Sequence, residues 1–215
     1  MTDLRARAKN LTPTRWLSGL HDLRATTDGA LYTAGHGLSA GLEGRIFGAN
    51  MGVVTTPVAI AATVAIVDTS PQAWIRVPDS TVIIPLYAKF VVEATGITTQ
   101  GEISHLIAQN DIGNGTSSAA DVGPVNLNTA VPAASTCTAR QDATGAATAP
   151  TNPLELSRFS FAASAVNQHF EWSGGNLGVY PIVRGAGSWA MYIGGNAASW
   201  YGQMVWMEFT EASVT

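Results

Sequence analysis

The sequence predicts a mostly β protein, a two-sheet antiparallel sandwich or barrel that follows an N-terminal arm with one short helix. Segments rich in β-branched and aromatic residues recur after about residue 50, and Gly, Pro, Asn or Asp bound them. Several of these segments are apolar on both faces, which is typical of strands that are covered on both sides. A chain of 215 residues is long enough for one well-buried core. We therefore expect a single β domain with appendages.

The arm is expected over residues 1–50. Thr12 can cap a helix and Pro13 suits its first position, so we expect a helix over about residues 13–24. The apolar side chains at helical spacing are Trp16, Leu17, Leu20 and Leu23. Glycines recur from Gly29 to Gly52, which favours an extended arm or loop over a helix. The sandwich domain is then expected over residues 51–215.

Nine strands are expected in the sandwich domain. Their approximate ranges are 53–67, 72–77, 81–95, 102–109, 154–164, 167–173, 178–184, 188–194 and 199–210. Residues 110–153 have almost no large side chains and form a Thr/Ala/Gly-rich excursion, or else a disordered insert. A structureless loop of that length is unusual in a compact domain, so we expect it to be functional or to be ordered by a neighbouring copy.

The last expected strand is apolar on both faces. Trp200, Met204 and Trp206 alternate with Tyr201, Val205, Met207 and Phe209. Either both faces are covered within the subunit, or another subunit covers one of them. We place Trp206 in the core, since a strand so rich in aromatic residues is typical of a sheet interior. The candidate core or interface residues are Trp16, Leu20, Trp189, Trp200, Trp206 and Phe209.

Charge is scarce and unevenly distributed. Only 12% of the residues are charged, against a usual figure of about 25%, and only two are Lys. Because Lys is depleted from buried interfaces and aromatic residues are enriched there, this composition predicts association. Residues 1–24 carry a net charge of +3, and the other residues carry −7. The basic arm residues Arg5, Arg7, Lys9 and Arg15 are too few to predict more than weak contact with nucleic acid, so we expect the arm to pack on neighbouring subunits.

Neither a secretory signal nor a membrane span is expected. The first ten residues are charged, and no apolar core of a signal peptide follows them. Residues 46–67 are long enough to span a bilayer and contain no charge. Pro57 and the many β-branched residues of that stretch favour strands instead.

No pattern in the sequence predicts catalysis, a cofactor or a metal site. Gly37–Gly41 fits the G-x-S-x-G motif around Ser39, but the strand-to-helix context that the motif requires is missing. The four histidines are isolated, and the closest His–carboxylate pair is His169 with Glu171. Cys137 is the only cysteine, so neither an intrachain disulfide nor a Cys-based zinc site can form. The strand carboxylates Glu93, Glu102, Glu155, Glu171 and Glu208 show no pairing that singles out two of them.

The arm, the many strands, the long excursion and the apolar final strand together resemble single jelly-roll capsid and capsid-associated proteins of bacterial viruses. The resemblance covers about residues 50–210 and includes WIRVPDSTVIIPLYAKFVVEATG and SWAMYIGGNAASWYGQMVWMEFTE. It implies a jelly-roll barrel in a virion, with copies of itself and other virion proteins as partners and without catalysis. A carbohydrate- or receptor-binding module of a viral fibre or a secreted protein is the alternative. Its stacking residues would come from Trp172, Trp189, Tyr192, Trp200 and Tyr201.

Overall fold

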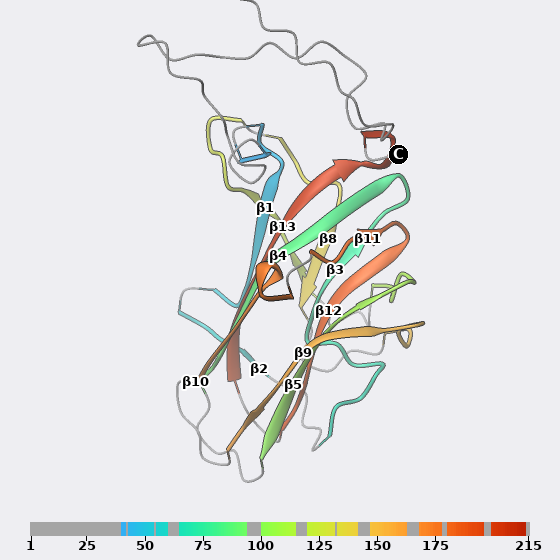
Figure 1. The fold of residues 1–215 in the computed structure, drawn as a ribbon. Coiled ribbons are helices and arrows are strands. Elements are labelled where there is room, and N and C mark those ends of the chain that lie inside the picture. Colours follow the sequence, from blue (N-terminus) through green and yellow to red (C-terminus); the bar gives the residue numbers. More distant parts are fainter. Residues whose placement is uncertain are drawn as a thin grey trace, which may run out of the picture.

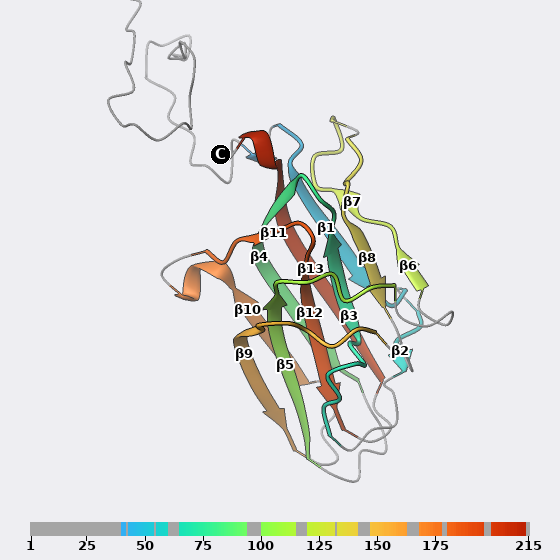
Figure 2. The same cartoon turned by 90° about the vertical axis from the view of Figure 1, so that its right-hand side faces the viewer.

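The computed structural model describes residues 40–41, 43–53, 55–59, 65–93, 100–114, 120–131, 133–141, 147–162, 168–177, 180–195 and 199–213. These residues form two antiparallel sheets that face each other as a sandwich (Figure 1). Figure 2 shows the same sandwich from the side, with the strands of the six-stranded sheet toward the viewer. The predicted sandwich is therefore confirmed.

One sheet has seven strands. Its main path runs β10 (Gln168–Ser173), β4 (Thr81–Val92), β13 (Ser199–Thr210), β1 (Ile46–Met51) and β7 (Val125–Asn126). Two short strands join this path, β11 (Val183–Arg184) on β4 and β2 (Val58–Ala59) on β13. The 3₁₀ turn η1 (Gly174–Leu177) follows β10, and η2 (Glu211–Ser213) follows β13.

The other sheet has six strands. Its order is β6 (Ala120–Val122), β8 (Thr138–Gln141), β3 (Ala73–Val77), β12 (Gly187–Gly194), β5 (Gly101–Ala108) and β9 (Leu154–Phe161). All eight residues of β12 are buried, as expected of a central strand that is covered on both faces.

The eight strands β1, β3, β4, β5, β9, β10, β12 and β13 pair in a nested order. The first strand, β1, pairs with the last, β13, and β3 pairs with β12. Inside these pairs, β4 pairs with β10, and β5 pairs with β9. This is the order that a long hairpin acquires when it is rolled up so that its successive pairs alternate between the two sheets.

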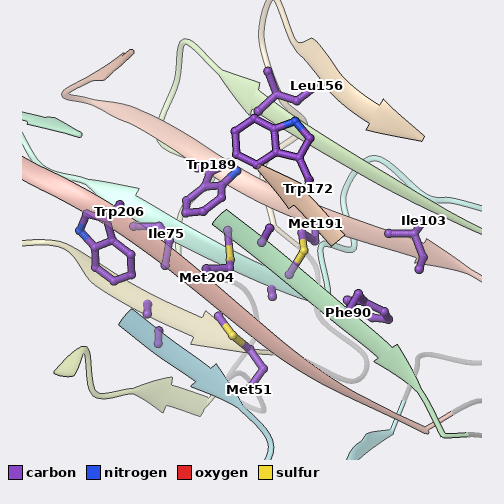
Figure 3. Close-up of a cluster of buried hydrophobic side chains, with 14 of the residues drawn as sticks. Met51, Ile75, Phe90, Ile103, Leu156, Trp172, Trp189, Met191, Met204 and Trp206 are labelled. Atoms are coloured by element: carbon purple, nitrogen blue, oxygen red, sulfur yellow. The ribbon is translucent and has the colours of Figure 1, made fainter. Parts of the chain in front are cut away.

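A tryptophan-rich core fills the space between the sheets. Figure 3 shows Trp206 and Met204 from β13 in the same cluster as Trp189 and Met191 from β12. Trp200 and Trp206 are fully buried, which confirms the prediction for Trp206. A Cβ atom at Gly202 would lie 2.4 Å from Cζ3 of Trp200, so the absence of a side chain at this position makes room for the indole.

Seven of the expected strands are confirmed to within a few residues, and two are wrong. The range 53–67 contains only the two-residue β2 in its described part, and the range 178–184 contains only β11 among its described residues, 180–184. Conversely, β1 lies in the glycine-rich segment that we assigned to the arm, so the expected boundary at residue 50 falls inside a strand. A strand was not predicted there because Gly48 and Asn50 interrupt its apolar pattern.

The excursion at 110–153 is partly built into the sandwich. It contributes β6 and β8 to the six-stranded sheet and β7 to the edge of the seven-stranded sheet. The helix expected over residues 13–24 and the rest of the arm up to residue 39 lie outside the described residues.

Candidate functional site: an apolar sheet face

The outer face of the seven-stranded sheet carries a patch of apolar side chains that we call the open face. It consists of Ile46, Ile84, Tyr87, Val205, Met207 and Phe209. Met207 lies opposite both Ile46 and Ile84 in the strand register. Neighbouring positions such as Phe47 and Trp206 point into the core, so the residues of the open face point away from it. All of them except Met207 are partly exposed.

Leu127 flanks the open face on the β7 side. Its backbone N donates to the carbonyl of Ile46 at 2.9 Å, which fixes the segment beside β1. A Cβ atom at Gly48 would lie 3.2 Å from Cδ1 of Leu127 and 3.7 Å from Cγ2 of Val205. The side chain of Leu127 therefore lies over Gly48 and next to Val205. It is 54% exposed, and Val125 nearby is 60% exposed.

Tyr180 and Ile182 flank the open face on the β11 side. They are 53% and 55% exposed. A Cβ atom at Gly174 would lie 2.6 Å from Cδ1 of Tyr180 and 2.8 Å from the carbonyl oxygen of Pro85. The ring of Tyr180 therefore lies close to β4, and large apolar side chains are exposed on both flanks of the sheet. Contiguous exposed apolar surface of this kind is typical of interaction sites.

A polar row closes the open face on one side. Asn50, Gln203, Lys89 and Glu171 lie opposite one another on four neighbouring strands. The Nζ of Lys89 is 3.6 Å from Oε1 of Glu171, and both side chains are partly exposed. The next row contains Gly48, Val205 and Tyr87 and is already apolar. Beyond the polar row, the same outer face carries Val91 and Tyr201, which lie opposite each other and are partly exposed. The polar row therefore borders the open face on one side, as polar residues commonly border interaction surfaces.

The outer face of the six-stranded sheet is different, because segments of the same chain cover it. A second apolar cluster lies on this covered face, and its buried members are Trp74, Leu106, Ala108, Ile112, Ala190 and Tyr192. Ile66 and Ala147 pack against it. The Nε1 of Trp74 donates to the carbonyl of Gly113 at 3.0 Å, so the polar atom of this buried indole has a hydrogen-bond partner.

The segment around Ile66 and the two ends of the excursion cover this face, and hydrogen bonds fix the ends of the excursion to the sheet. Ser188 Oγ on β12 donates to the carbonyl of Asn110 at 2.9 Å and accepts from the N of Ile112 at 3.1 Å. The side chain of Asn110 accepts from the N of Thr151 and donates to the carbonyl of Ala149, which joins the two ends. These bonds explain how the two described ends of a segment with few large side chains are held against the sheet.

Arg76 and Asp111 form the charged contact at the same place. Nε of Arg76 donates to Oδ1 of Asp111 at 2.8 Å, and Asp111 Oδ1 also accepts from the N of Gly113. The hydrogen bond from Arg76 lowers the pKa of the Asp111 carboxyl below its ordinary value, although burial opposes the shift. The same bond raises the pKa of Arg76. Asp111 is therefore ionised at neutral pH and fixes the excursion to β3.

Glu208 is a buried carboxylate at the end of β13. It accepts hydrogen bonds from Ser135 Oγ at 2.6 Å, from the N and Oγ1 of Thr136 at 2.7 Å each, and from Nε1 of Trp206 at 3.3 Å. Burial raises the pKa of Glu208, but these hydrogen bonds outweigh burial, and the net pKa is lowered. A cavity of about 300 Å³ adjoins it, lined in part by Arg45, Thr81 and Ser213. Because four donors already surround the carboxylate, Glu208 has a structural role: it holds the segment of Ser135 and Thr136 against the end of β13.

His105 lies in the core between the sheets. Nε1 of Trp189 donates to its Nε2, so the proton of the neutral ring is on Nδ1, which is 3.3 Å from Ser157 Oγ. The ring of Trp172 meets it edge-on at a centroid distance of 4.7 Å. Burial lowers the pKa of His105 to about 3. His105 is therefore a neutral, hydrogen-bonded core residue at physiological pH.

The structure separates the residues that the sequence grouped as candidates. Trp189, Trp200 and Trp206 are fully buried, whereas Phe209 lies on the open face with the Arg45 guanidinium 5.4 Å from its ring centroid. The stacking platform of the alternative prediction is wrong for most of its members, because Trp172, Trp189, Tyr192 and Trp200 are buried and Tyr201 alone is partly exposed. Trp16, Leu20, Arg5, Arg7, Lys9, Arg15 and Ser39 lie outside the described residues.

The other polar candidates occur mainly as surface pairs. Arg158 bonds to both Glu155 and Glu102, and His169 is exposed on β10. Cys137 is buried, and burial strongly raises the pKa of its thiol. Within the ranges that the structure describes, there is no group of three or more His, Cys, Asp or Glu side chains that could hold a metal ion. No helix in those ranges is long and apolar enough to cross a membrane.

No protein-family model matches the chain, and no curated protein matches it. The open face is thus the main functional candidate among the described residues. Its signal in the sequence was the two-sided apolar character of residues 199–210. What the sequence did not show was the contribution of Leu127, Tyr180 and Ile182, which lie outside the strands that they flank.

Proposed function

We propose that this chain is a structural subunit of a virus particle, a capsid or capsid-associated protein of a bacterial virus that acts by self-assembly. The observation that carries the proposal is the open face. It presents apolar side chains from β1, β4 and β13, flanked by Leu127, Tyr180 and Ile182, each more than half exposed. Such a surface is costly to leave in water and is favourable to bury against another subunit.

The nested strand pairing supports a jelly roll as the finer description of the sandwich. Eight strands that pair first with last and second with seventh fit two Greek keys wound into two sheets. Viral capsid proteins, lectins and cupins all use this architecture, so the fold alone does not assign the function. The open face favours the capsid class, because the described indoles that the sugar-stacking alternative relies on, those of Trp172, Trp189 and Trp200, are buried.

The composition supports the same proposal. A chain with 12% charged residues and only two Lys has little to keep its copies apart. The partners in this proposal are other copies of the chain and other virion proteins, and its location is the virion.

Native mass spectrometry and negative-stain imaging of the purified full chain test the proposal. We expect multimeric particles that survive dilution. The variant Val205→Lys places a charge in the middle of the open face and should abolish them while circular dichroism and the melting temperature stay close to those of the unchanged protein. Ser160→Lys is the matched control, because Ser160 is exposed on β9 of the other sheet. If the protein without substitutions remains monomeric at high concentration, the proposal is refuted.

A further inference from the structure

We propose that the open face is the docking site for the N-terminal segment Pro13–Arg24 of a neighbouring copy. The inference rests on the proposed function and adds to it the segment that binds and the surface that receives it.

The arm leaves the sandwich at the edge of the open face. The carbonyl of Gly41 accepts from Nδ2 of Asn128 at 3.1 Å, and Asn128 is next to Leu127 in the chain. A Cβ atom at Gly41 would lie 3.6 Å from Cδ1 of Ile46, which belongs to the open face. The 39 residues that precede the described part are therefore tethered beside the surface that needs cover.

The segment has the chemistry that the open face requires. Its apolar side chains at helical spacing are Trp16, Leu17, Leu20 and Leu23. In a helix these side chains lie on one side, and a helix with one apolar side must bury it against another element. Residues 1–24 carry a net charge of +3 and the remaining residues −7, so the two parts attract each other.

The length of the proposed helix also agrees with the length of the open face along the strands. A helix over 12 residues is about 18 Å long, and the strand β13, also of 12 residues, is about 40 Å long. One half of the sheet, up to the polar row of Asn50, Gln203, Lys89 and Glu171, thus matches the length of the helix. The connection over residues 25–39 can span about 50 Å when extended, enough to reach the next subunit.

The segment is assigned to a neighbouring copy and not to its own chain for one reason. A segment folded back on its own sheet would close the open face within the monomer, and the proposed assembly would lose the surface that drives it. Exchange of such a segment between identical subunits joins them without a new kind of contact.

Thiol crosslinking between two variant chains tests the inference. One chain carries Leu20→Cys, the other carries Val205→Cys, and the two are co-expressed with different tags. Cys137 is buried and its thiol pKa is raised, so the unchanged chain gives the background reaction. With a short bis-maleimide we expect a product that contains one chain of each kind. The control pair Leu20→Cys with Ser160→Cys should lose this product.

Each other outcome contradicts a defined part of the inference. A product formed only within single chains of the double variant Leu20→Cys/Val205→Cys would overturn the assignment to a neighbouring copy. Particles that form without the 20–205 product would overturn the docking site and leave the proposed function standing. Absence of particles from the unchanged chain would overturn the proposed function itself, and this inference with it.

Discussion

The outer faces of the two sheets differ in how they are covered, although the strands beneath them are equally apolar. On the six-stranded sheet, Trp74, Leu106 and Tyr192 are buried under Ile66, Ile112 and Ala147 of the same chain. On the seven-stranded sheet, the corresponding surface around Val205 and Phe209 stays partly exposed. Strands with two apolar faces therefore occur in two settings in this molecule: on one sheet the outer face is covered by the same chain, and on the other it is left partly exposed, which is the surface that the proposed assembly would bury.

The core shared by both sheets should show the largest effect. Trp206→Ala removes a fully buried indole and one of the donors to Glu208, and we expect it to cost about 3–5 kcal/mol of unfolding free energy. That is a large share of the stability of a typical domain. Denaturant unfolding of the arm-deleted subunit, residues 25–215, measures it without interference from assembly. A loss below about 1 kcal/mol would contradict the burial of this side chain.

The covered face should come next. Leu106→Ala truncates a side chain that is 9% exposed beneath the ends of the excursion. We expect a loss of about 2–4 kcal/mol in the same unfolding measurement, because the cavity is enclosed by the chain itself. If Leu106→Ala destabilised only the particles and not the subunit, another copy would be covering this face. The two sheets would then not differ in how their outer faces are covered.

The core also predicts a pH dependence that does not involve the open face. His105 has an ordinary pKa of about 6.5 when unfolded, and burial lowers it to about 3 in the folded chain. Between these values the unfolded chain binds the extra proton, so stability falls as the pH is lowered from about 6.5, by up to about 1.4 kcal/mol per pH unit. Unfolding curves between about pH 6.5 and 5 test this, above the range in which carboxylates titrate. His105→Gln should flatten the profile, and an equal slope in both proteins would assign it to other groups.

The open face should show the smallest effect on the subunit. Leu127→Ala is the matched partner of Leu106→Ala, since the same side chain is removed from a site that is 54% exposed. We expect a change of less than about 0.5 kcal/mol in the subunit and a clear loss of particles in native mass spectrometry. A large loss of subunit stability would mean that Leu127 belongs to the core and would remove it from the proposed interface.

Much of the sandwich could be predicted because local signals bound its strands. In Val77-Pro78-Asp79-Ser80 a Pro followed by an Asp is a turn signal, and the structure has a turn there between β3 and β4, in which the N of Thr81 donates to the carbonyl of Pro78 at 3.2 Å. The strand β1 was missed for an equally physical reason. Gly48 suggests a loop, but here its missing side chain makes room for Leu127, a contact with a residue far along the chain.

The covered and open faces could not be told apart from the sequence. Trp74 and Tyr192 on one sheet and Val205 on the other all lie between two apolar residues in the sequence. The difference lies in the ends of the excursion, which Ser188 and Asn110 fasten over one sheet only. Hydrogen bonds between such distant positions leave no periodic signal, so the site became visible only in three dimensions.

The hydrogen-bonded carboxylate of Glu208 has a consequence for how the last strand finds its place. A shift of one residue turns every side chain of a strand to the opposite face, and alternation of apolar and polar residues normally forbids it. In β13 that safeguard is weak, since Val205, Met207 and Phe209 could enter the core almost as readily as Met204 and Trp206. Glu208 could not tolerate the shift, because its charge would lose the hydroxyl and amide donors of Ser135 and Thr136. The carboxylate of Glu208 thus fixes the register of β13, which the apolar residues on its two faces would leave undetermined.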